Sequence, residues 1–307
     1  MHRDNEVINR LNKLPPVANI ICNSVLLIFA LIIIMPLILV VVVSFTDPKS
    51  IGEIGYSYFP AKLSLTGYEY LFKTGDQVLT SYRITIIATV LGTLASLFVT
   101  AMFSFVLAQR NFVFNRLFIW IMFFTMLFSG GLVPYYILCT LYLHINDTIW
   151  IYILPSLVSG FNVIILRTFM RTTIPEALFD SARIDGAGYF KIFWTIAIPL
   201  SKAGLATIAL FNVVTRWNDW FTALLFIDKP DLVPLQTMLM RIQSKIDFIK
   251  NNSRAANTPD GLILMRNLPG DNLRMACTLL VILPLTMTYP FFQRFFISGL
   301  TLGSIKE

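Results

Sequence analysis

VANIICNSVLLIFALIIIMPLILVVVVSF, residues 17–45, is a mostly apolar run without a charged side chain. A helix needs about 20 mostly apolar residues to cross roughly 30 Å of hydrocarbon, so this run is long enough. Pro36 lies inside it and is expected to kink the helix, which membrane helices tolerate when their neighbours satisfy the freed carbonyl group. Asp47-Pro48 then stops the run. These residues predict a first transmembrane helix.

Five further apolar runs follow, at approximately 82–108, 117–133, 149–169, 199–226 and 273–296. Between the third and fourth runs, SGGLVP at residues 129–134 is followed by an apolar stretch that glycine and proline interrupt. This pattern predicts a broken helix end or a re-entrant turn. We therefore expect an all-α integral membrane protein with six transmembrane helices.

The composition excludes a water-soluble globule. Of the 307 residues 56% are hydrophobic and 13% are charged, whereas a soluble domain carries about 25% charged residues. The net charge of +7 does not indicate nucleic-acid binding, because the basic residues lie between apolar runs and form no stripe with aromatic residues. Cys22, Cys139 and Cys277 lie far apart without a CxxC motif or a histidine cluster, so neither a disulfide framework nor a metal site is expected. His144 is a lone loop histidine without a second ligand, and no cleavable signal peptide is expected.

The distribution of lysine and arginine predicts the orientation, because short basic loops stay on the cytoplasmic side. Basic residues occur in the N-terminal tail, in the loop after the second run and in the loop after the fourth run, whereas residues 135–147 contain neither lysine nor arginine. Both termini are then cytoplasmic. We expect residues 1–80 to hold the N-terminal tail, the first helix and an external loop, and residues 81–299 to form a five-helix core. A cytoplasmic loop at 173–190, a long external loop at 228–272 and a cytoplasmic tail at 300–307 complete the prediction.

The cytoplasmic loop TIPEALFDSARIDGAG, residues 173–188, carries helix signals. Thr173 and Glu176 have the spacing of a capping box, and Pro175 lies near the first helical position. Gly186 follows Asp185 where a left-handed C-terminal cap would end the helix. A second segment, 189–198, leads back to the membrane. The local pattern alone also fits an interfacial amphipathic helix that merely joins two spans.

The order of residues within this loop resembles a known motif. Asp180-Ser181-Ala182, then Gly186, then Ile198-Pro199-Leu200 resemble the EAA loop of bacterial binding-protein-dependent ABC importers. Asp180 replaces the usual Glu and Ser181 the first Ala. The resemblance implies the type I importer permease fold and a coupling helix that sits in a cleft of an ATP-binding subunit. It assigns coupling to Glu176, Asp180, Ser181, Ala182, Asp185, Gly186 and Ala187.

Three other stretches extend the resemblance to carbohydrate importers of the maltose type, in the branch that imports oligosaccharides: residues 129–134, 271–276 and 289–306. The resemblance implies a plasma-membrane complex that contains a second homologous permease, two ATP-binding subunits and an extracellular solute-binding protein. The chain has no GxxxxGK[ST] loop, the motif that cradles nucleotide phosphates. ATP-Mg would therefore bind to the partner subunits, and this chain is expected to be neither an enzyme nor a cofactor-binding protein.

Polar residues in the fifth run suggest a solute path. Asn212, Arg216 and Asp219 are spaced to share one helix face, with Arg216 and Asp219 placed to pair. Trp217 and Asn218 lie beside them, and aromatic rings with amides can bind sugars. These residues also suit the outer membrane interface, where tryptophans gather and charges reach water.

Three alternative functions remain to be distinguished. One is an importer permease whose solute is not a sugar. An intramembrane enzyme needs paired carboxylates, a Ser/His arrangement or HExxH, and no such arrangement was found beside the runs. A secondary transporter would show inverted repeats and ion-coupling residues near mid-membrane, and would not need a capped cytoplasmic elbow.

Overall fold

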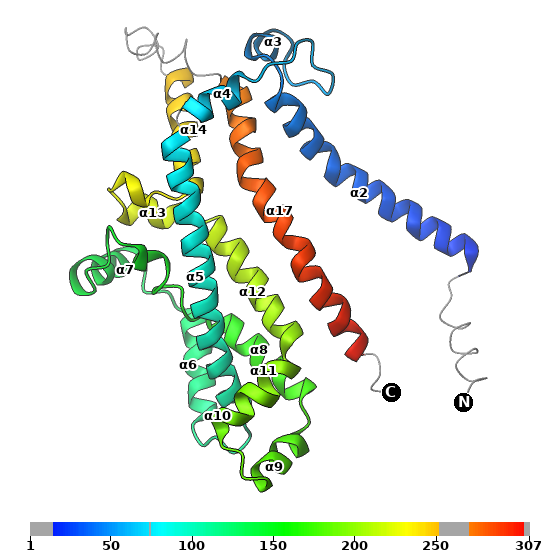
Figure 1. Ribbon diagram of the computed structural model, residues 1–307, viewed down its shortest axis with the longest axis vertical. Coiled ribbons are helices and arrows are strands. Elements are labelled where there is room, and N and C mark those ends of the chain that lie inside the picture. Colours follow the sequence, from blue (N-terminus) through cyan, green and yellow to red (C-terminus); the bar gives the residue numbers. More distant parts are fainter. Residues whose placement is uncertain (1–14, 74, 252–269, 304–307) are drawn as a thin grey trace. The chain divides into compact units, whose positions relative to one another are not determined.

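The computed structural model describes residues 15–73, 75–251 and 270–303 (Figure 1). The chain divides into two compact units. Unit 1 contains residues 1–71 and 252–279, and unit 2 contains residues 72–251 and 280–307. Across the described ranges the regular elements are helical, and the one β-type contact is a bridge between Thr46 and Leu63. The all-α prediction is confirmed for these residues.

Unit 1 begins with α2, Pro16–Ser44, which has Pro36 in its interior as predicted. Most of its apolar side chains are exposed in this single chain, as expected of a helix that faces lipid or another protein. The short helix α3, Pro48–Ile54, and most of α4, Thr66–Lys73, follow. The long helix α17, Gly270–Gly303, begins in unit 1 and continues into unit 2.

Asn272 joins the elements of unit 1. Its side-chain amide donates hydrogen bonds to the carbonyl oxygens of Ser44 (2.9 Å) and Thr46 (2.6 Å), at the end of α2. Gly67 in α4 leaves room for this amide, since a Cβ atom there would overlap its oxygen. Carbonyl groups at a helix end lack partners within the helix, so a fully buried asparagine satisfies them here.

Unit 2 is built around α5, Gly75–Ala108, which packs most extensively against α12 and α8. Small or hydroxyl-bearing residues recur at every fourth position on one buried face of α5, at residues 88, 92, 96, 100 and 104. Such residues allow neighbouring helix backbones to approach closely. Ser104 donates to the Val163 carbonyl of α8 (3.1 Å), and Ser96 donates to the Asn212 side chain of α12 (3.3 Å).

The remaining helices of unit 2 are shorter than α5. They are α6 (Asn115–Leu127), α7 (Leu132–Ile137), α8 (Gly160–Thr173), α9 (Glu176–Ile184), α10 (Tyr189–Ile192), α11 (Ile198–Leu200), α12 (Lys202–Trp217), α13 (Phe221–Phe226) and α14 (Leu235–Asn251). Four single turns lie between them, at Leu138–Tyr142, Ile149–Tyr152, Phe193–Ala197 and Pro230–Leu232.

The apolar runs do not all become single helices. The predicted break after the third run is confirmed, because α6 and the segment Leu132–Tyr142 meet at 111°. The fourth run was predicted as one helix over 149–169, which is wrong. Residues 149–152 form a tight turn, Pro155 interrupts the segment that follows, and α8 begins only at Gly160, where Ser159 caps it. The fifth run divides into α11, α12 and α13, with a bend of 79° before α12.

Three helices among the described residues are long and apolar enough to cross a membrane, or up to five spans if each bent pair counts as one. Helix α8 has 14 residues and is therefore about 21 Å long at 1.5 Å per residue. Part of the predicted loop 228–272 is helical, because α14 occupies 235–251. Residues 252–269, most of the N-terminal tail and the last residues of the C-terminal tail lie outside the described ranges.

Candidate functional site

Helix α9 ends in the tight turn that the sequence predicted. Gly186 has φ of +78°, its N–H donates to the Arg183 carbonyl (3.0 Å), and the Ala187 N–H donates to the Ala182 carbonyl (2.9 Å). This pair of bonds is a Schellman motif, in which a left-handed glycine closes a helix and satisfies its last carbonyl groups.

The N-terminus of α9 differs from the prediction. Thr173 is the last residue of α8 rather than a cap, and Pro175 is the N-cap residue with extended backbone and no side-chain capping bond. The predicted capping box is therefore wrong. The physical reason is that Pro175 forces the preceding residue, Ile174, out of the helical region, which separates Thr173 from α9.

The acidic residues assigned to coupling contact arginines of the same chain. Glu176 pairs with Arg110 (3.0 Å) and Asp180 pairs with Arg183 (3.2 Å). Both carboxylates are exposed, and exposed pairs contribute at most about 1 kcal/mol. Asp185 is exposed at the C-cap, so it is the assigned acid most open to a partner's basic group.

The two faces of α9 differ. Phe179 is buried and packs edge-to-face on Phe105 of α5, with ring centroids 6.1 Å apart. Ala182 and Ala187 pack against the hydrophobic core to which Phe105 and Phe179 belong. On the outer side Ser181 and Asp185 are exposed, and Ile184 is 86% exposed. The helix is thus anchored through one face and presents small, acidic and apolar groups on the other.

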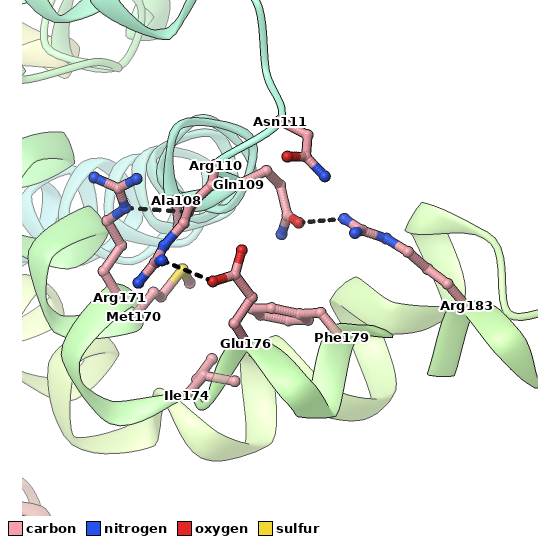
Figure 2. Close-up of a pocket in the computed structure, with 10 residues that line it drawn as sticks. All are labelled: Ala108, Gln109, Arg110, Asn111, Met170, Arg171, Ile174, Glu176, Phe179 and Arg183. Atoms are coloured by element: carbon pink, nitrogen blue, oxygen red, sulfur yellow. Dashed lines mark hydrogen bonds and ion pairs between the residues drawn. The ribbon is translucent and has the colours of Figure 1, made fainter. Parts of the chain in front are cut away.

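A pocket of about 370 Å³ lies between α9, α8 and the segment that follows α5 (Figure 2). Gln109, Arg110, Arg171 and Arg183 line it together with Glu176. Arg183 donates to the side-chain oxygen of Gln109 (2.7 Å), and Figure 2 shows this bond beside the Arg110–Glu176 pair. Gln109 and these arginines were not among the predicted coupling residues. The signal available in the sequence was the arginine inside the motif, at position 183.

The last carbonyl groups of α5 are held by side chains from other helices. Arg167 donates to the Leu107 carbonyl (2.9 Å) and Arg171 donates to the Ala108 carbonyl (3.2 Å). Asn115 of α6 donates to the carbonyls of Leu107 (3.0 Å) and Gln109 (3.2 Å). Positive charge at a helix C-terminus is favourable because the helix dipole is negative there. The end of α5 is therefore fixed to both α8 and α6.

A second cavity in unit 2 has a volume of about 800 Å³ and lies among α5, α8, α12 and the segment before α8. Asn212, Arg216 and Asp219 line it, as do Asn162 and Ser159. Three of the five residues predicted for a solute path are thus gathered around one cavity. Trp217 and Asn218 are not among its lining residues.

Arg216 has different partners from those predicted. It donates to the backbone carbonyls of Tyr152 and Ser156 (2.9 Å to the latter), and its guanidinium lies against Gly92 of α5. No ion pair joins it to Asp219 in the part of the chain that the structure describes. Helix α12 ends at Trp217, so Asp219 lies beyond the helical face and instead accepts a bond from the Thr222 N–H (3.0 Å) at the start of α13.

Trp217 and Asn218 serve the helix packing. The indole N–H of Trp217 donates to the Val281 carbonyl of α17 (3.0 Å), and the ring is buried. Asn218 is exposed and donates to the Val214 carbonyl (2.9 Å) within its own helix. A part for either residue in a solute path stays a prediction.

Asp147 joins two loops of unit 2. Its carboxylate accepts hydrogen bonds from the backbone N–H groups of Asp228 (2.7 Å) and Lys229 (3.1 Å). These bonds stabilise the charged form and lower the pKa of Asp147 below its ordinary value. Its own N–H donates to the Phe226 carbonyl (3.0 Å), which fixes the connection before residue 149 to the end of α13.

Within the described ranges no three His, Cys, Asp or Glu side chains are grouped as a metal site would need, and Cys22, Cys139 and Cys277 are free thiols.

Comparison with known proteins is consistent across sequence and structure. Residues 101–301 match the family described as "Binding-protein-dependent transport system inner membrane component". The polygalacturonan/rhamnogalacturonan transport system permease protein YtcP of Bacillus subtilis is 34% identical over 92% of this chain and 95% of its own. Protein LplC of the same organism is 35% identical over 90% of each chain. A solved bacterial ABC transporter involved in the import of the acidic polysaccharide alginate superposes with a TM-score of 0.77 at 28% identity, covering 92% of this chain and 99% of the other.

Proposed function

Because this chain belongs to the family of binding-protein-dependent transport system inner membrane components, we propose that it is one of two homologous permeases of an ABC importer. With its partner it forms the path for an oligosaccharide or other sugar that an extracellular solute-binding protein delivers. The observation that carries this proposal is the Schellman-capped α9, which is anchored through Phe179 and exposes Ile184 and Asp185.

In this proposal α9 is the coupling helix, and two separate ATP-binding subunits hold ATP-Mg and hydrolyse it. Ala182 and Ala187 are small enough to let the helix lie close to the hydrophobic core of its own chain, Gly186 turns the chain, and Asp185 offers a carboxylate to a basic group. Glu176 and Asp180 act within the chain, because both already pair with arginines. Ser181 lies on the exposed side.

We further infer that the chain spans the bacterial plasma membrane six times with both termini in the cytoplasm. The long helices α2, α5 and α17 and the two bent pairs provide five spans. The short helix α8, together with the non-helical segment before it, is proposed as the sixth. Backbone that is not helical is tolerated at membrane depth where it lines a cavity, and Tyr152, Ser156 and Ser159 line one here.

The cavity of about 800 Å³ is proposed as this chain's part of the solute path. Its polar lining includes Asn162, Asn212 and the Asp219 carboxylate, groups that can exchange hydrogen bonds with sugar hydroxyls. A sugar is favoured as solute because YtcP is named for polygalacturonan and rhamnogalacturonan transport, and the superposed transporter for alginate import. Arg216 shapes the wall of this cavity through Tyr152 and Ser156.

The coupling assignment is tested with the complete complex of both permeases and the ATP-binding subunits, purified through a tag on the ATP-binding subunit. Ala182→Arg and Gly186→Leu are expected to remain in the membrane but to lose solute-stimulated ATP hydrolysis. Ala182→Arg would displace α9 from the core on which it packs, and Gly186→Leu would strain the left-handed turn that ends the helix. Thr195→Val is the matched control, since Thr195 is exposed nearby and its hydroxyl donates to the Lys191 carbonyl (2.7 Å). Full transport by both bulky variants would refute the coupling role of α9.

A further inference from the structure

Helix α5 connects the two cavities of unit 2, the larger one lined by Arg216 and the smaller pocket beside α9. It runs from Gly75 to Ala108 without a proline. Thr85 and Ala88 line the larger cavity, and Gly92 touches the guanidinium of Arg216. Gln109, directly after the helix, lines the smaller pocket beside α9. From position 92 to its last residue at position 108, α5 rises about 24 Å at 1.5 Å per residue.

Side-chain contacts of two kinds join α9 to the end of α5 and the residues directly after it. The ring of Phe179 packs on Phe105. The polar contacts are the bond of 2.7 Å from Arg183 to Gln109 and the ion pair of Glu176 with Arg110. Gln109 is 9% exposed and the Arg183 side chain is 30% exposed, whereas the neighbouring Arg110–Glu176 pair is 70% and 43% exposed. A shielded bond to a charged donor is stronger than an exposed ion pair, so the Gln109–Arg183 bond is the firmer polar link.

The end of α5 cannot turn independently of its neighbours. Arg167 and Arg171 hold its last carbonyl groups from α8, and α8 is joined directly to α9 through residues 174 and 175. A displacement of α9 therefore pulls on α5 through Gln109 and Phe105 and on α8 through the chain itself. Because packed helices move as rigid bodies, the displacement reaches the wall of the larger cavity along α5.

We propose that α5 transmits the movement of α9 to the cavity, and that Gln109 and Arg183 are the positioning residues that join the two helices. This inference rests on the proposed role of α9 as coupling helix. It extends coupling to Gln109 and Arg183, which are not among the residues that the motif assigns, and to helix α5.

The test measures ATP hydrolysed per solute imported by the complete importer in proteoliposomes. Gln109→Leu and Arg183→Leu are each expected to raise this ratio by roughly five- to tenfold, the usual size of a coupling term. The double variant should raise the ratio no further than either single variant does, because each of the three variants lacks the bond between Arg183 and Gln109. The maximal uptake rate should fall, while the concentration of loaded binding protein that gives half-maximal uptake stays unchanged.

Two conservative variants separate positioning from folding. Gln109→Glu keeps an acceptor for Arg183 and should couple as the wild type does. The exchange variant, Gln109→Arg with Arg183→Gln, restores a bond in the reverse direction and should recover most of the coupling. Wild-type ratios in both leucine variants, multiplying effects in the double variant, or an exchange variant as poor as the singles would each overturn the proposal.

Ala182→Arg distinguishes this inference from the function on which it rests. If Ala182→Arg transports normally, α9 is not the coupling helix and both proposals fail. If Ala182→Arg loses coupling but Gln109→Leu retains it, the coupling helix stands and the role of α5 is refuted.

Discussion

Arg216 shows how one side chain can hold three elements at once. It starts on α12, lies against Gly92 of α5, and donates to two carbonyl groups in the segment before α8. That segment is not helical at Ser156, so its carbonyl groups need partners from elsewhere. At the residue scale the cavity wall therefore depends on the space that Gly92 leaves, on the guanidinium of Arg216 and on the two carbonyl oxygens that this guanidinium bonds.

Gly92→Ala should destabilise the protein, because a Cβ atom would overlap the guanidinium that Arg216 holds against α5. We expect a loss of about 1–3 kcal/mol, the usual cost of overpacking, and a lower midpoint of thermal unfolding in detergent. Gly75→Ala is the control in the same helix, since nothing lies within 4 Å of its Cβ position. Combining Gly92→Ala with Arg216→Ala should cost less than the sum of the two; strict additivity would contradict the contact.

The contribution of Asp147 to stability should depend on pH. Its folded-state pKa is lowered by the N–H groups of Asp228 and Lys229. Its charge therefore adds stability fully above the unfolded pKa of about 4 and loses that contribution as pH falls through the folded pKa. The wild type should unfold at a higher temperature than Asp147→Asn at pH near 7, and this gap should close in acid. A gap that is the same at both pH values would show that the charge plays no part.

At the scale of elements, local chemistry decided what the sequence could predict. The break at residues 129–134 and the turn at Gly186 are set by glycine and proline in their own neighbourhoods, and both predictions are confirmed. The short α8 was missed because residues 149–159 are as apolar as a span. Their path depends on distant partners, namely Arg216 and the bond from the Tyr152 hydroxyl to the Leu232 carbonyl (2.9 Å). Hydropathy alone does not predict such long-range hydrogen bonds.

Local sequence spacing also decided which residues of the candidate sites could be predicted. The motif predicts that α9 couples to a partner, and helical spacing predicts that Asn212, Arg216 and Asp219 lie near one another, because both inferences rest on spacing within a single segment. Neither could find Gln109, whose hydrogen bond joins it to a residue 74 positions away. The place of Trp217 on the solute path stays a prediction, and in the structure its indole N–H donates to the Val281 carbonyl.

The junction in unit 1 can be tested at this scale. Asn272→Leu removes the donor that satisfies the carbonyl groups of Ser44 and Thr46. Leaving buried acceptors without partners costs about 1–3 kcal/mol, so the variant should unfold at lower temperature in detergent. Asn23→Leu is the control, because Asn23 is exposed on α2 and its amide donates to the Asn19 side chain of the same helix (3.5 Å). Equal effects of the two substitutions would rule out a special role for the α2–α17 junction.

At the scale of the whole molecule, the chain belongs to a family of binding-protein-dependent transport components. The proposed permease takes its energy from separate ATP-binding subunits, which would act on it through α9. A secondary transporter would instead draw on an ion gradient and require no ATP-binding subunit.

The most direct test of this claim is oligosaccharide uptake by the complete importer in proteoliposomes. We predict that uptake requires enclosed ATP, the ATP-binding subunits and the solute-binding protein, and that an ionophore which collapses ion gradients leaves it unchanged. Uptake that an imposed ion gradient drives through the two permeases alone, without ATP, would contradict the account.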